Sequence, residues 1–124
     1  RLADWYVRQQ GLKNSHFRTM TAMSRGETPG PESSINKVVS ATKYQDISFF
    51  GMEMQEMAGI MTDPEEVAMD SLFQTGAMSS PGYRIAGGTD EILRNIIAER
   101  VLGLPQDVRL DKEGAFRDLP TGRD

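Results

Sequence analysis

A glycine turn that opens an apolar helix is the feature that most constrains how this chain folds. Gly87 and Gly88 precede Thr89, and the helical pattern that follows ends at Gly103 and Pro105. Paired glycines allow backbone conformations that side chains forbid, and threonine is a favourable N-cap residue. An apolar stripe follows along the helix: Ile92, Leu93, Ile96, Ile97 and Val101. The pattern predicts a buried helix whose first amides suit a phosphate or a carbonyl oxygen.

Three helical segments are expected before this turn. Apolar residues recur at three- and four-residue steps over residues 2–25, 31–57 and 64–78. Gly26 is the expected end of the first helix, Asp63-Pro64 the start of the third, and residues 79–82 a loop. Four helices with short links and no strand pattern predict an all-α fold, an antiparallel up-down four-helix bundle over residues 1–104. Residues 105–124 are expected to form an extended tail.

Composition narrows the classes of function. The 124 residues suffice for one domain, and the net charge of −4 disfavours a nucleic-acid-binding protein. The chain has no cysteine and one histidine, so we expect no metal site and a reducing, cytoplasmic setting. No apolar run approaches twenty residues, which predicts no membrane span. His16 falls on the apolar side of the first segment, where a packing role is expected, and the eight methionines are expected in the core.

The order of several motifs resembles one family along almost the whole chain. The string GGTDEILRNIIAERVLGLP is similar to the end of the C-terminal helical domain of acyl-CoA dehydrogenases. RLADWYVRQQGLKNSHFRTM and RGETPGPESSINKVVSATKYQDI resemble two consecutive helices of that domain, and DKEGAFRDLP resembles endings of bacterial members. Because the chain begins inside a helical pattern, we expect it to be a fragment that lacks the first helix of the bundle.

The resemblance implies a flavoenzyme of fatty acid metabolism. Its members use FAD to oxidise an acyl-CoA thioester to the trans-2-enoyl-CoA, pass electrons to electron-transfer flavoprotein, and form dimers or tetramers. By this resemblance Thr89, Asp90 and Glu91 contact the cofactor, and the backbone of Gly87 and Gly88 lines the substrate thioester. Asp90 stands where serine is commoner, which is a mild change at a cap expected to be exposed. The fragment alone is expected to be inactive.

Two departures from the family pattern leave a second interpretation open. The glutamate base of many members immediately precedes the Gly-Thr pair, and that position is Gly87 here. We therefore expect no catalytic residue at the turn and a base further upstream in the full protein. The glycine-rich loop expected before the turn is replaced by EMAGIMTDPEE, in which Gly59 is the one glycine. The alternative is a non-catalytic subunit that supports oligomerisation and cofactor contact in a heteromeric dehydrogenase.

Overall fold

All regular secondary structure in the described part of the chain is helical. The structure is a computed structural model that describes residues 1–106 and 115–118. Its α-helices are α1 (Leu2–Ser24), α2 (Ser33–Met54), α3 (Leu72–Ile85) and α4 (Asp90–Ile96), and a π-helical segment, Ile97–Val101, continues α4. Short 3₁₀ helices cover Glu56–Ile60, Ala68–Ser71 and Phe116–Asp118. The all-α prediction is confirmed, whereas most of the predicted tail lies outside the described residues.

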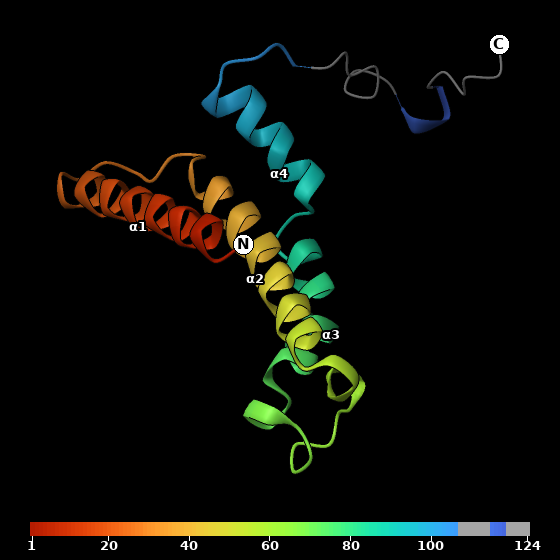
Figure 1. Ribbon diagram of the computed structural model, residues 1–124. Helices are drawn as coiled ribbons and strands as arrows, with labels where there is room; N and C mark the ends of the chain where they lie inside the picture. Colours follow the sequence, from red (N-terminus) through yellow and green to blue (C-terminus); the bar gives the residue numbers. More distant parts are fainter. Residues whose placement is uncertain (107–114, 119–124) are drawn as a thin grey trace.

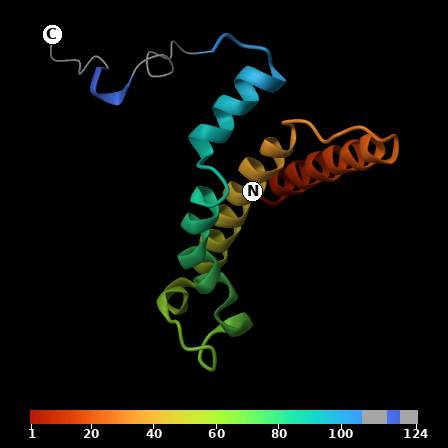
Figure 2. The ribbon, with the colours of Figure 1, turned by 180° about the vertical axis from the view of Figure 1, so that it is seen from behind.

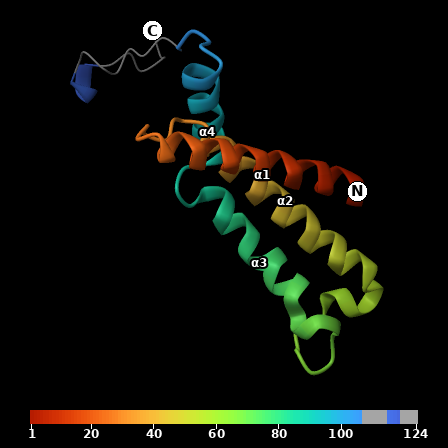
Figure 3. The same cartoon turned by 90° about the vertical axis from the view of Figure 1, so that its left-hand side faces the viewer.

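Helix α2 contacts each of the other three α-helices. It packs along α3 and contacts both α1 and α4. The chain reverses direction between α1 and α2 and again between α2 and α3 (Figure 3). Helix α4 then leads away from the α2–α3 pair (Figures 1 and 2). The first three helices thus alternate in direction, whereas α4 diverges from them, so the antiparallel four-helix bundle predicted over residues 1–104 stays a prediction.

Small residues bring α2 and α3 close together. A Cβ atom added at Gly51 would overlap the ring of Phe73, and one at Gly76 would overlap the hydroxyl of Ser48. Tyr44 and Tyr83 add an edge-to-face ring contact between the same helices, with centroids 5.4 Å apart. The buried core of this pair is accordingly made of small side chains, among them Ala41, Ser48, Ala77 and Ser80.

The apolar faces of α1 and α4 are largely uncovered. Helix α1 lies wholly within the described residues and has no buried side chain. His16 is exposed, so the expectation that it packs in the apolar seam is wrong. Of the apolar stripe predicted to be buried on α4, Leu93 is buried, whereas Ile92 is 54% exposed. Both expectations assumed a neighbour along the whole of each apolar face, whereas the described elements cover these faces in part, as where Trp5 of α1 packs on Phe50 of α2.

The third helix differs from its prediction at both ends. The expected start at Asp63 is a local turn, in which the Asp63 carboxylate accepts from the backbone N–H of Glu65 at 3.0 Å. Helix α3 begins at Leu72 and runs through Pro81, where the sequence suggested a loop. Proline has no N–H to donate to the carbonyl of Ala77. The hydroxyl of Ser80 donates to that carbonyl at 2.9 Å, which explains why the helix continues.

We predict that Ser80→Ala lowers the free energy of unfolding by about 1–3 kcal/mol, because it leaves a buried carbonyl without a donor. Ser79→Ala is the matched control, since the exposed Ser79 hydroxyl also donates to carbonyls of the same helix, those of Thr75 and Gly76. Its cost is expected to stay below about 0.5 kcal/mol. Urea unfolding monitored by circular dichroism measures both. Equal costs for the two variants would contradict the role given to Ser80.

Candidate functional site

The predicted glycine turn connects α3 to α4. Gly87 has φ 69° and Gly88 has φ 106°, both in the region that favours glycine. Gly87 is exposed, with open space where a side chain would stand. On the inner side, a Cβ at Gly88 would lie 3.3 Å from the side chain of Leu93, which is buried. The turn is therefore packed on one side and accessible on the other.

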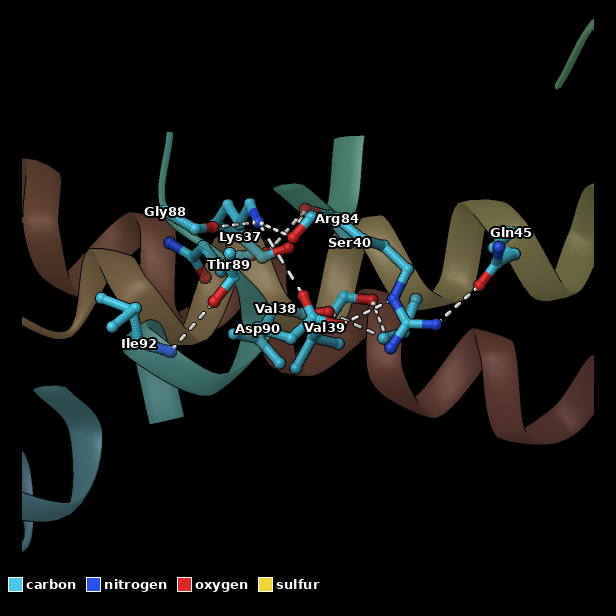
Figure 4. A network of polar contacts seen from close by, with 12 residues as sticks. Lys37, Val38, Val39, Ser40, Gln45, Arg84, Gly88, Thr89, Asp90 and Ile92 are labelled. Atoms are coloured by element: carbon cyan, nitrogen blue, oxygen red, sulfur yellow. Dashed lines mark hydrogen bonds and ion pairs between the residues drawn. The ribbon is translucent and has the colours of Figure 1, made fainter. Parts of the chain in front are cut away.

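Thr89 caps α4 as the sequence predicted. Its backbone is extended, and its side-chain Oγ1 accepts from the backbone N–H of Ile92 at 3.3 Å (Figure 4). This bond satisfies one of the amides that the start of a helix leaves without an intrahelical partner.

Glu91 is exposed on the first turn of α4, and its carboxylate is held locally. Two hydrogen bonds lower the pKa of Glu91 below its ordinary value of 4.5. The larger effect comes from its own backbone N–H, and the smaller comes from the Thr89 hydroxyl. A lowered pKa means that the ionised carboxylate stabilises the folded state above the unfolded pKa, and that this contribution is lost as the pH falls through the folded pKa. Glu91 is therefore ionised at neutral pH.

Asp90 occupies a different position from its neighbours. It is 2% exposed, which corrects the expectation of an exposed cap. Its Oδ2 accepts from Arg84 Nε at 2.6 Å, and Lys37 Nζ lies 3.8 Å from its Oδ1 (Figure 4). Lys37 Nζ also donates to the carbonyls of Arg84 at 2.9 Å and Gly88 at 2.7 Å. We call Lys37, Arg84 and Asp90 the Asp90 cluster.

The Asp90 cluster joins three helices at one point. Lys37 comes from α2, Arg84 from the last turn of α3, and Asp90 is the first residue of α4. Arg84 also donates through Nη1 to Gln45 Oε1 of α2 at 2.9 Å. Sequence reasoning missed Lys37 and Arg84, although a cation just before the turn and an acid just after it were visible signals.

The predicted site residues thus divide into two groups. Gly87, Gly88, Thr89 and Glu91 are at least partly accessible, whereas the Asp90 carboxylate faces inward. Two cavities, of about 260 and 300 Å³, lie around Trp5 and Phe50. The first lies between α1 and α2, the second also borders Ala68 and Phe73, and neither is lined by residues of the turn. Among the residues described, no group of histidine, cysteine or carboxylate side chains could hold a metal ion. Nor is any helix in the described ranges long and apolar enough to cross a membrane.

This helical chain, with its capped glycine turn before α4, matches a protein-family model. The model describes the C-terminal domain of acyl-CoA dehydrogenases and matches residues 1–102, which include the turn and all four α-helices. The chain belongs to the acyl-CoA dehydrogenase family.

Curated relatives agree with this assignment. Acyl-CoA dehydrogenase IpdE1 of Mycolicibacterium smegmatis is 33% identical over 109 residues, which are 88% of this chain and 26% of that protein. Acyl-CoA dehydrogenase FadE34 of Mycobacterium tuberculosis is 33% identical over 81 residues, 65% of this chain and 10% of that protein. The chain therefore spans about a quarter or less of the length of these relatives.

A solved structure has the same fold. The Tcur3481-Tcur3483 steroid ACAD superposes with a TM-score of 0.71 at 19% identity, over 86% of this chain and 28% of that chain. At this identity the likeness concerns the arrangement of helices alone.

We predict that Thr89→Ala lowers the free energy of unfolding by about 1 kcal/mol, because an amide at the start of α4 loses its acceptor. Thr89→Ser keeps the hydroxyl and is expected to retain most of the stability. Denaturant unfolding of the two variants beside the parent protein measures the difference. Equal stabilities for the alanine and serine variants would contradict a capping role for Thr89.

Proposed function

We propose that this chain is the C-terminal domain of an FAD-dependent acyl-CoA dehydrogenase. The reaction removes a proton from C2 and a hydride from C3 of an acyl-CoA thioester, leaving the trans-2-enoyl-CoA. The observation that carries the proposal is the family match over residues 1–102, which includes a glycine turn with an accessible polar edge. Electrons pass from the flavin to electron-transfer flavoprotein, and the protein acts in the cytoplasm as a homo- or hetero-oligomer.

The accessible edge of the turn fits a flavin. When bound, FAD supplies the hydride acceptor. Thr89 and Glu91, together with the backbone at Asp90, would hold it, because these groups offer hydrogen-bonding atoms beside exposed Gly87. Glu91 brings negative charge, whereas the cations of the Asp90 cluster are already paired. This edge therefore suits the uncharged polar atoms of FAD better than its phosphates.

The turn itself offers no suitable base. Gly87, where many family members have glutamate, has no side chain, and the Asp90 carboxylate is buried against Lys37 and Arg84. The lowered pKa of Glu91 makes its carboxylate a weaker proton acceptor. We infer that the base comes from another part of the full-length protein. Gly87 and Gly88 then serve the substrate by allowing its thioester to approach the backbone closely.

A second candidate is a non-catalytic subunit of a heteromeric dehydrogenase. Two observations favour it: the turn lacks a base, and α1 exposes large apolar side chains such as Tyr6, at 66%, and Val7, at 67%. Exposed apolar faces of this kind mark contact surfaces. The structural neighbour is named as a steroid ACAD and carries two designations, Tcur3481 and Tcur3483. In this second candidate the domain contacts the cofactor, and a partner subunit supplies the catalytic residues. A steroid thioester is therefore among the substrates to test.

The test is the anaerobic absorption spectrum of the full-length protein with straight-chain acyl-CoAs of several lengths and a steroid-CoA thioester. We expect bound flavin that bleaches with one of these classes. A 2,2-dimethylacyl-CoA is the control, since it has no C2 hydrogen to lose and should leave the spectrum oxidised.

Flavin that stays oxidised with every thioester would favour the non-catalytic subunit over the enzyme. Purified protein that binds no flavin, either alone or with its partner subunit, would contradict both candidates.

A further inference from the structure

We propose that Lys37, Arg84 and Asp90 are positioning residues, which fix the backbone of the glycine turn so that its accessible edge faces the cofactor. In this proposal the Asp90 carboxylate acts through the turn and does not touch the flavin. The inference rests on the proposed function for the identity of the ligand, but the interaction itself is a property of this chain.

The first argument is the way in which Lys37 engages the turn. Its ammonium group donates to the carbonyl of Arg84, before the glycines, and to that of Gly88, directly before the cap. One side chain from α2 therefore holds both sides of the turn (Figure 4). Hydrogen bonds from a charged donor are stronger than those between neutral groups. The flexibility that two positive-φ glycines would otherwise give the backbone is thereby restricted.

The second argument is the cost of burying Asp90. Its side chain is 3% exposed, and an ionised carboxylate at such a place is strongly unfavourable unless it is paired. Arg84 Nε at 2.6 Å and Lys37 Nζ at 3.8 Å supply the opposite charge. Oδ1 has no hydrogen-bond partner, so its interaction with Lys37 is electrostatic. Moving the start of α4 away from α2 and the end of α3 would leave this charge unpaired, which ties the helix to its present position.

The third argument is that apolar packing contributes little to this position. The buried residues of α4 are Asp90 and Leu93, and none of the residues in the π-helical continuation is buried. Of the two, Leu93 packs beneath Gly88, and Asp90 joins the cations of α2 and α3. The ion pairs therefore carry a large share of the contact that sets where the accessible edge lies.

The experiment compares Lys37→Met and Asp90→Asn in the full-length protein. We expect amide hydrogen exchange over residues 85–92 to become at least about tenfold faster in each, because removing one partner of a buried ion pair destabilises the arrangement. Flavin affinity is expected to fall by about tenfold or more, with a changed visible spectrum of the flavin that remains bound. Lys13→Met and Asp46→Asn, at exposed positions on α1 and α2, are the charge-matched controls.

Arg84 provides a milder test, because its side chain is 38% exposed and its loss threatens folding less. Arg84→Met should speed exchange at the turn, and Arg84→Lys, which keeps the charge, should restore slow exchange and flavin affinity at least in part. Rescue by the conservative variant separates a positioning role for the charge from loss of side-chain volume. Exchange in the α2–α3 contact around Gly51 and Gly76 should stay unchanged in both variants.

The outcomes separate the positioning role from the proposed function. Unchanged exchange at residues 85–92 in all variants would overturn the inference whether or not the protein binds flavin. Faster exchange with unaltered flavin affinity and spectrum would overturn the link between the Asp90 cluster and the cofactor. A parent protein without flavin would refute the proposed function, while the exchange data would still decide whether the Asp90 cluster fixes the turn.

Discussion

The pairing of the buried Asp90 carboxylate governs the arrangement of the last part of this domain. A carboxylate that is 2% exposed is stabilised by opposite charge beside it. Lys37 and Arg84 meet that requirement only if α2, the end of α3 and the start of α4 converge. The turn then lies between α3 and α4 with its carbonyls toward Lys37 and exposed Gly87 on the accessible side. A polar contact, more than an apolar one, therefore sets the position of the candidate site.

Local features could be predicted from the sequence, and long-range features could not. The positive φ values of Gly87 and Gly88 and the cap at Thr89 follow from a few adjacent residues, and the structure confirms them. The burial of Asp90 depends on Lys37, which belongs to another helix, so an acid at a helix start was interpreted as exposed. Ser80 and Pro81 predict a loop because each disfavours helices, yet the Ser80 hydroxyl donates to the Ala77 carbonyl, which Pro81 cannot do, and α3 continues through both residues.

The exposed apolar faces fit a domain that works inside a larger protein. Helix α1 has no buried side chain, and α4 buries Leu93 as its one large apolar residue. The chain spans about a quarter of the length of one relative and a tenth of another. Under the proposed function, those faces pack against other parts of the dehydrogenase or a second subunit, and the base comes from there too. Under the same proposal, the turn contacts the cofactor and the proton acceptor comes from elsewhere in the protein.

The most direct measurement is the structure of the full-length protein with flavin bound. Our account predicts flavin atoms within hydrogen-bonding distance, about 2.7–3.2 Å, of Thr89 or the backbone of residues 89–91. It also predicts that the Asp90 carboxylate remains with Lys37 and Arg84. A carboxylate turned outward onto the flavin would contradict the positioning role. A flavin bound away from the turn would contradict the candidate site itself.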